Sequence, residues 1–456
     1  MSAHVAPMLP RRTFLRAGLG LFGGIGLADW LALRAQAGQP DRSPQSAIVL
    51  FCWGGLSHID SFDMKPDAID VRGEFKPIST TVPGISYCEH LPRLAGQAQH
   101  IAVVNGVHHA TAVHRFAATW NLTGRPFNAS SLGPPSRRDW PSLGAMVSKV
   151  TEDRRQSIMP GTVTLPYPIA DHGLANGQDG GFLGASYDPV IAAPAEGTPY
   201  EGLSPSAGVI DLKPAAGIAP PRLASRRELL SSLERSGEHL PVETERQTAS
   251  RDQALDLLTS AKASDAFDLE REPVANRERY GNHICGRSVL LARRLTEAGV
   301  PLVTVNCAAG DLNGSVGAHF DTHVDNFGRL KHQMLPPLDQ AASALIADLA
   351  ERGRLESTLV LILTEFGRTP QIGGGAGRDH FPNCYSVAFA GGGIAGGQVY
   401  GRSDRIAAAP DENGSSPADV HATVFRSLGI DPGTYITDLD GRPFPVSEGK
   451  PLPLFG

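Results

Sequence analysis

Short apolar runs alternate with longer amphipathic stretches along this 456-residue chain. Six runs of four to seven residues are too short for helices and predict buried strands. They lie at 47–53, 101–104, 162–165, 300–306, 359–364 and 385–390. Helical periodicity predicts helices at 282–298, 325–352 and 417–428. This alternation predicts an α/β fold built on a mostly parallel sheet.

The regular alternation is interrupted between about 128 and 278. Residues 128–217 are rich in Gly, Pro, Ser and Ala, and helical patterns at 222–236 and 248–264 follow. Long irregular segments inside a compact protein are usually binding loops or lids. The segment is therefore predicted to be an insertion that lies over the strand-end crevice as a lid and specificity region.

The first 37 residues have the features of an export signal. Arg11 and Arg12 precede a glycine-rich apolar run, and Ala35-Gln36-Ala37 forms an A-x-A cleavage site. The Ser or Thr usual before such arginines is replaced by Pro10. The run is too rich in glycine, and broken by Asp29, to be a convincing membrane span. We therefore expect a twin-arginine signal peptide, and a single domain from 38 to 456 that is periplasmic or extracellular.

This expectation has a direct test. Replacing Arg11 and Arg12 by Lys should leave full-length precursor in the cytoplasm, because the twin-arginine translocase reads the arginine pair. Immunoblots of cytoplasmic and periplasmic fractions measure the outcome. Normal processing of the double variant would contradict the assignment.

Charge and cysteine content exclude two classes of function. The chain has a formal net charge of −6, and removal of the arginine-rich leader makes the remainder more acidic. Nucleic-acid binding draws on Lys and Arg, so an acidic surface argues against a nucleic-acid partner. The five cysteines are widely spaced and contain no CxxC, which argues against a disulfide framework or a zinc–thiolate site.

Polar side chains gather where four of the predicted strands end. The groups are His58 with Asp60, His108 with His109 and His114, Asp321 with His323, and Glu365 with Arg368 and His380. The carboxyl ends of parallel strands meet at one edge of a sheet, so we expect these groups to converge. The predicted metal ligands are Asp321, His323, Glu365 and His380, with His58 or Asp60 nearby. Mixed carboxylate and imidazole ligands suit Zn, Mn, Fe or Ni, whereas Ca needs more oxygens. The pattern predicts a divalent metal ion without distinguishing Zn, Ca and Mn.

Each group also has a purely structural explanation. Asp321 or Thr322 could cap the helix that starts nearby, and Glu365 with Arg368 could be a surface ion pair. The glycine run 373–377 is weak as a phosphate loop because no Lys-Ser/Thr follows it. The clustering of otherwise sparse histidines favours the metal site.

Several motifs resemble those of a widespread family of exported bacterial proteins that bear the domain of unknown function 1501. They include Trp53-Gly-Gly-Leu-Ser-His-Ile-Asp-Ser-Phe-Asp63, Asp321-Thr-His323, Glu365-Phe-Gly-Arg-Thr-Pro370 and Gly377-Arg-Asp-His380. The match runs from about 46 to 446. The family is similar to the alkaline-phosphatase-like superfamily, which includes the sulfatases. The resemblance implies a three-layer α/β sandwich with metals at the strand ends.

The sequence departs from that superfamily at three places. The stretch from His109 to Arg115 has no Cys for the formylglycine of sulfatases. The first strand ends in Trp53-Gly54 instead of an Asp ligand, and Glu365-Phe366-Gly367 replaces an Asp-His-Gly motif. One metal is therefore the safer expectation than two.

The resemblance leaves the nucleophile open. Thr111, near a helix N-terminus where amide dipoles favour anions, is the candidate. His114 and Arg368 are the other candidate catalytic residues, with Arg368 placed to stabilise developing charge.

Two functional hypotheses follow. The first is an exported metal-dependent hydrolase of small-molecule or glycan sulfate or phosphate esters. The alternative is a non-catalytic exported binding protein that keeps the fold and one metal. The sequence indicates neither a substrate nor an oligomeric state.

Overall fold

A single large sheet runs through the centre of the domain. The computed structural model describes residues 46–127, 133–155, 157–204, 260–313 and 317–456, with isolated positions between 225 and 259. The sheet has eight strands in the order β12-β4-β11-β8-β1-β7-β5-β6. They are β1 (Ser46–Phe51), β4 (Ile101–Val107), β5 (Thr162–Leu165), β6 (Val190–Ile191), β7 (Leu302–Asn306), β8 (Thr358–Leu363), β11 (Tyr385–Ala390) and β12 (Gln398–Tyr400).

The direction of these strands confirms a mostly parallel sheet. β1 pairs in parallel with β7 and β8, and β7 pairs in parallel with β5. β11 runs antiparallel to both β4 and β8, so β4 points the same way as β8. Every residue of β1 and β8 is buried, which explains why these strands are continuous apolar runs. The carboxyl ends of β1, β4, β7 and β8 lie at the same edge.

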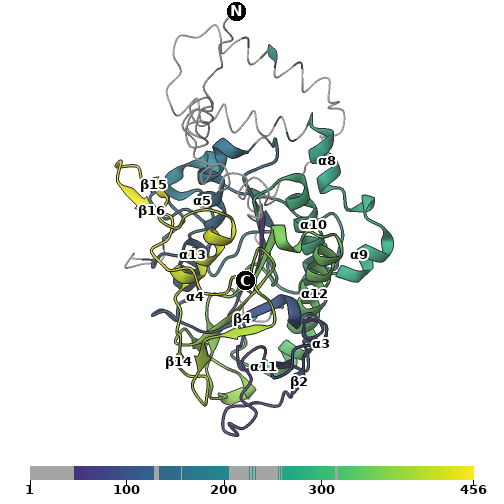
Figure 1. Cartoon of the computed structure of the whole chain (residues 1–456), viewed down its shortest axis with the longest axis vertical. Helices are drawn as coiled ribbons and strands as arrows, with labels where there is room; N and C mark the ends of the chain where they lie inside the picture. The colour runs from purple at the N-terminus through teal and green to yellow at the C-terminus, as the bar shows by residue number, and fades with distance from the viewer. Residues whose placement is uncertain are drawn as a thin grey trace, which may run out of the picture. The chain divides into compact units, whose positions relative to one another are not determined.

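Helices cover both faces of the sheet, as the predicted three-layer sandwich requires (Figure 1). On one side lie α4 (His114–Thr123), α5 (Leu143–Val150) and α13 (Pro417–Ser427). On the other side lie α3 (Pro92–Ala95), α8 (Ala261–Phe267), α9 (Val274–Tyr280), α10 (Ile284–Ala298) and α12 (Leu335–Glu351). α5 packs on β5 and β7, whereas α10 packs on β1 and β7.

The predicted helix 325–352 forms in three parts. α11 (Asn326–Arg329) continues into a π-helical turn, Leu330–Met334, and then into α12. Pro336 and Pro337 at the start of α12 lack amide protons, so the regular hydrogen-bond register cannot pass through them. A π turn of this kind often lies next to a functional site.

The predicted insertion needs a correction. β5 and β6 fall within 128–278, yet they are strands of the central sheet, and α5 packs on it. The strand at 162–165 was predicted, but its place in the central sheet was not, because irregular loops surround it; β6 has only two residues and was missed. Most of 222–259 lies outside the described residues, as does the predicted signal peptide.

The described loops after β5 do lie at the carboxyl edge of the sheet. The indole Nε1 of Trp53, which follows β1, donates to Ala170 O at 3.3 Å. The Asp311 amide, which follows β7, donates to Leu203 O at 3.0 Å. This position agrees with a segment that borders the strand-end crevice, and the lid role stays a prediction.

Four two-stranded ribbons complete the fold. They are β2 (Pro77–Ser79) with β3 (Ser86–Cys88), β9 (Gly367–Arg368) with β10 (His380–Phe381), β13 (Arg402–Ser403) with β14 (Pro410–Glu412), and β15 (Tyr435–Thr437) with β16 (Pro443–Pro445). In the β9–β10 ribbon Arg368 pairs directly with His380. The ribbon thus places two of the predicted site residues side by side.

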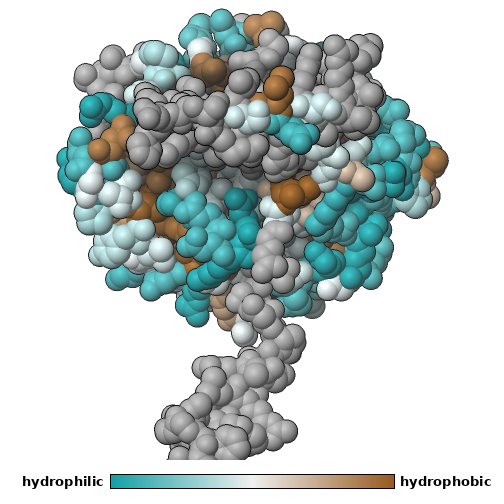
Figure 2. Space-filling model, turned by 90° about the horizontal axis from the view of Figure 1, so that it is seen from above, coloured by the Kyte–Doolittle hydropathy of each residue, from teal (hydrophilic) through white to brown (hydrophobic). Residues whose placement is uncertain are grey.

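The surface and the cysteines agree with the composition. On the face in Figure 2 the described residues are mostly hydrophilic, and hydrophobic residues form small separate patches. No helix among the described residues is long and apolar enough to cross a membrane. All five cysteines are buried free thiols.

Candidate metal centre

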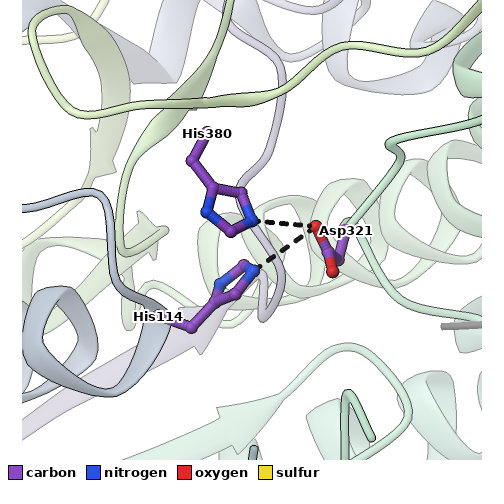
Figure 3. A group of neighbouring side chains, drawn as sticks. All are labelled: His114, Asp321 and His380. Carbon is purple, nitrogen blue, oxygen red and sulfur yellow. Dashed lines mark hydrogen bonds and ion pairs between the residues drawn. The ribbon is translucent and has the colours of Figure 1, made fainter. Parts of the chain in front are cut away.

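Three structural elements bring a cluster of imidazole and carboxylate groups to the carboxyl edge of the sheet. His114 is the first residue of α4, which follows β4. Asp321 and His323 lie in the loop between β7 and α11. His380 begins β10. His114, Asp321 and His380 form a group that could hold a metal ion (Figure 3).

Asp321 Oδ1 is the centre of this group. The Nε2 atoms of His114, His323 and His380 lie 3.3, 3.1 and 3.2 Å from it. His323 Nε2 and His380 Nε2 lie 2.9 Å apart. In Figure 3 the rings of His114 and His380 point their nitrogens at the Asp321 carboxylate.

In each of the three histidines Nδ1, the nitrogen that faces away from Asp321, donates a hydrogen bond to a protein oxygen. His114 Nδ1 lies 2.7 Å from Glu365 Oε1, and His323 Nδ1 lies 2.6 Å from Asp379 Oδ1. His380 Nδ1 lies 2.7 Å from the carbonyl oxygen of Ala112. Carboxylate and carbonyl oxygens can only accept, so each Nδ1 carries the proton. Metal-binding histidines are usually oriented in this way.

This arrangement fits a metal ion. Because Nδ1 of each ring is held by its acceptor, Nε2 is the atom that each ring turns towards Asp321. A proton on Nε2 can donate to the Asp321 carboxylate, and a metal ion would take the place of that proton. Ligands of a tetrahedral site with bonds of about 2.0–2.1 Å lie roughly 3.3 Å apart, close to the distances here. His114, Asp321 and His380 could therefore hold one ion, and His323 Nε2, which lies 3.1 Å from Asp321 Oδ1, is a further candidate ligand.

The charges around Asp321 keep it ionised. Burial alone would raise the pKa of this carboxyl, but hydrogen bonds from His114, His323 and His380 and the Arg368 charge hold it well below its usual range. Burial opposes protonation of His114 too, yet contacts with Asp321 and Glu365 raise its pKa overall. Burial lowers the pKa of His380.

The cluster is open on one side. The side chains of His114 and Asp321 are 5% and 10% exposed, whereas those of His380 and His323 are 23% and 42% exposed. A small molecule could reach the group from the side of His323 and His380.

Glu365, a predicted ligand, contacts the cluster only through the outward-facing Nδ1 of His114. Its Oε1 accepts from His114 Nδ1 and from the amide of Gly54 at 2.9 Å, and its side chain is fully buried. Gly54 reaches it with φ +109°, and an added Cβ there would meet the Asp321 amide at 2.4 Å. Glu365 therefore orients His114 and is not among the four converging groups.

His58 and Asp60 do not join the cluster. His58 Nε2 donates to the carbonyl of Ala407 at 2.9 Å. Both oxygens of Asp60 are taken by Arg378, at 2.8 Å from Nε and 3.1 Å from Nη2. The prediction that one of them would lie at the metal fails because the sharp turn after β1 carries the chain beneath the 369–378 loop.

Arg368 uses four of its five N–H donors on protein acceptors. It is fully buried, and Nη2 lies 2.5 Å from Asp321 Oδ1 and donates to Gly54 O. Nε donates to Gly55 O at 3.2 Å and Nη1 to Arg378 O at 3.0 Å. This geometry favours a role in positioning Asp321 over direct contact with a reacting group.

Thr111 lies on the loop between β4 and α4 that borders the cluster. It is half-buried, and its Oγ1 accepts from the Val113 amide at 3.3 Å. The next residue, Ala112, carries the carbonyl that holds His380. The hydroxyl is thus close to the cluster in the chain, although it does not contact the four groups.

The motif analysis did not single out Arg329 as a site residue. It is buried, and its Nη1 donates to the Asp321 carbonyl at 2.7 Å while Nη2 donates to Gly317 O at 2.6 Å. Arg329 thereby fixes the loop that carries Asp321. Two signals could have found it: Arg329 lies directly before the buried stripe of the 325–352 helix, and it belongs to the family motif Asp325-Asn-Phe-Gly-Arg-Leu-Lys331.

A family comparison agrees with the sequence motifs. Residues 44–453 match the model of a family described as a protein of unknown function (DUF1501). The chain belongs to this family. No curated protein matches this DUF1501 chain.

Among solved structures, the DUF1501 chain is similar to sulfatases and alkaline phosphatases. The PsFucS1 sulfatase from Pseudoalteromonas sp. is 14% identical with a TM-score of 0.38, and the match covers 93% of this chain and 74% of that one. The alkaline phosphatase from the Antarctic bacterium TAB5 is 12% identical with a TM-score of 0.38, over 85% and 99% of the two chains. Such coarse overlaps do not align individual side chains, so the chemistry of the cluster rests on its own residues.

Proposed function

We propose that this DUF1501 protein is an exported metal-dependent hydrolase of sulfate or phosphate esters. The observation that carries the proposal is the convergence of three imidazole nitrogens on Asp321 Oδ1, at 3.1–3.3 Å, with one side open to solvent. The ester class comes from the resemblance of the motifs to the alkaline-phosphatase-like superfamily.

The ligand set suits one divalent ion of the Zn, Mn, Fe or Ni group. Asp321, His114, His323 and His380 would hold it, and no additional carboxylate among the described residues is placed for the oxygen-rich shell of Ca. When bound, such an ion acts as a Lewis acid towards an ester oxygen or a water molecule.

The surrounding residues would hold the site in its working geometry. Glu365 and Asp379 keep the Nδ1 protons of His114 and His323, so that both rings present Nε2 inward. Arg368 fixes the Asp321 carboxylate and the turn after β1. In this proposal the Thr111 hydroxyl or a water attacks the sulfur or phosphorus atom. The bond to the leaving oxygen breaks, and that oxygen takes up the proton released by the attacking hydroxyl or water. If Thr111 attacks, a water then cleaves the threonine ester, which releases sulfate or phosphate and returns the proton to the Thr111 oxygen.

The test combines metal analysis with an ester assay. The purified mature protein should contain about one metal per chain, and stripping with a chelator should abolish hydrolysis of 4-nitrophenyl sulfate or 4-nitrophenyl phosphate. Reloading with Zn or Mn should restore it. Thr111→Ala and Thr111→Ser then separate the nucleophiles, since an attacking threonine hydroxyl is kept only in the serine variant.

Each outcome separates the hypotheses. Bound metal with turnover of neither ester removes the hydrolase and leaves the binding protein. No bound metal in folded protein, under any metal supply, removes the metal centre itself.

A further inference from the structure

A second hollow lies away from the metal cluster, beside the β15–β16 ribbon. It has a volume of about 240 Å³. The residues that line it include Arg138, Trp140, Phe182, Asp440, Arg442 and Phe444. In Figure 1 the ribbon lies beside α5, which Trp140 precedes. We call this hollow the ribbon cleft.

Aromatic rings form one wall of the ribbon cleft. The Trp140 ring contacts Phe182 and Phe444 edge-on, each with centroids 5.1 Å apart. The Arg125 guanidinium stacks 4.6 Å from the centre of the Trp140 ring. Arg125 is itself held by the Pro445 carbonyl at 2.7 Å and by Glu448. The Trp140 ring is therefore fixed in place before any ligand arrives, which lowers the entropic cost of binding.

Charged groups of both signs also line the ribbon cleft. Arg442 pairs with Asp438 at 2.7 Å and with Asp440 at 3.1 Å, and the Asp438 carboxylate also accepts from the Asp440 and Arg442 amides. These bonds make the loop of the ribbon rigid. Arg138 is exposed, and its guanidinium has no ion-pair partner among the described residues. Rigid donors and acceptors thus line the same hollow as the aromatic rings.

We propose that the ribbon cleft binds a saccharide unit. A sugar ring presents an apolar face of C–H groups to an aromatic ring, and its hydroxyls both donate to carboxylates and accept from guanidinium groups. The cleft offers all three partners, and its volume lies just below the ~300–1,000 Å³ of sites for drug-sized ligands. It therefore suits one ring of an oligosaccharide.

The ribbon cleft is distinct from the metal cluster. Arg125, which backs the aromatic wall, follows the last turn of α4, whereas His114 at the first turn belongs to the cluster. Ten helical residues span about 15 Å. The cleft would hold a saccharide whether or not the cluster hydrolyses esters, so the two proposals can fail separately.

Titration calorimetry with three probes tests the proposal: maltohexaose, chondroitin hexasaccharide and sulfated chondroitin hexasaccharide. At least one is expected to bind the mature protein, and equally well after metal removal. Arg138→Ala should weaken that binding at least tenfold, and Trp140→Phe, which keeps the ring packing, should weaken it several-fold. Arg405→Ala, another exposed arginine with no ion-pair partner among the described residues, is the matched control and should bind like wild type.

Absence of binding for all three probes would overturn the proposal. So would an unchanged affinity in Arg138→Ala together with Trp140→Phe. Circular dichroism spectra equal to that of wild type show that these variants are folded.

Discussion

Replacement of His380 by Ala is expected to lower metal affinity by more than the ~10–100-fold typical for loss of an orienting partner. The change removes one of three imidazole nitrogens around Asp321 Oδ1. His323→Ala should act in the same way, because its Nε2 lies at the same centre. Competition with a chromogenic chelator measures the affinity, and circular dichroism checks the fold.

Two comparisons sharpen this prediction. Glu365→Gln should lower metal affinity by about 10–100-fold, which is less than the loss expected for His380→Ala, because Glu365 only orients His114. His172→Ala, at a histidine with a 75% exposed side chain outside the cluster, should leave affinity unchanged. If folded His380→Ala kept wild-type affinity, the assignment of His380 as a ligand would fall.

The second large effect concerns stability. Asp60→Asn should destabilise the domain by about 3–5 kcal/mol, because it leaves the Arg378 guanidinium buried without its counter-charge. Both side chains of this ion pair are fully buried. Ser57 Oγ and Asn326 Nδ2 also donate to Asp60, at 2.6 and 2.9 Å, so the change disturbs a whole network. Thermal unfolding with tightly controlled metal content measures the loss.

Controls separate charge burial from general damage. The double variant Asp60→Leu with Arg378→Met removes both charges and should lose less stability than Asp60→Asn. Asp411→Asn breaks the exposed pair with Arg402 and should change stability far less than Asp60→Asn, because solvent screens this pair. A single variant as stable as wild type would show that the buried pair contributes little.

The same variant tests the alternative role of Asp60. If Asp60 were a metal ligand, folded Asp60→Asn would lose metal as His380→Ala does. Its oxygens are taken by Arg378, so we expect folded Asp60→Asn to keep about one metal per chain. Metal content, measured below the unfolding temperature, therefore distinguishes a ligand from a structural carboxylate.

The strands and their polar ends followed from local sequence. A strand such as 359–364 is buried on both faces of a parallel sheet, so all of its residues are apolar or nearly so. The strand can therefore be recognised from the sequence as a continuous apolar run. The directional rule for parallel strands then predicted that Asp321, His323 and His380 would lie together. The structure brings His323 and His380 to Asp321 Oδ1, and whether the three residues bind a metal stays a prediction.

Side-chain partners were decided by tertiary structure alone. Glu365 and Asp60 each follow a strand and looked equivalent in sequence, yet one orients His114 and the other pairs with Arg378. His114 enters the cluster only because α4 begins at that residue. Hydropathy records how deeply a residue is buried. Hydropathy does not record which charged residue of a distant loop a side chain will contact. That contact depends on turns such as the one at Gly54 and on the pairing of β9 with β10.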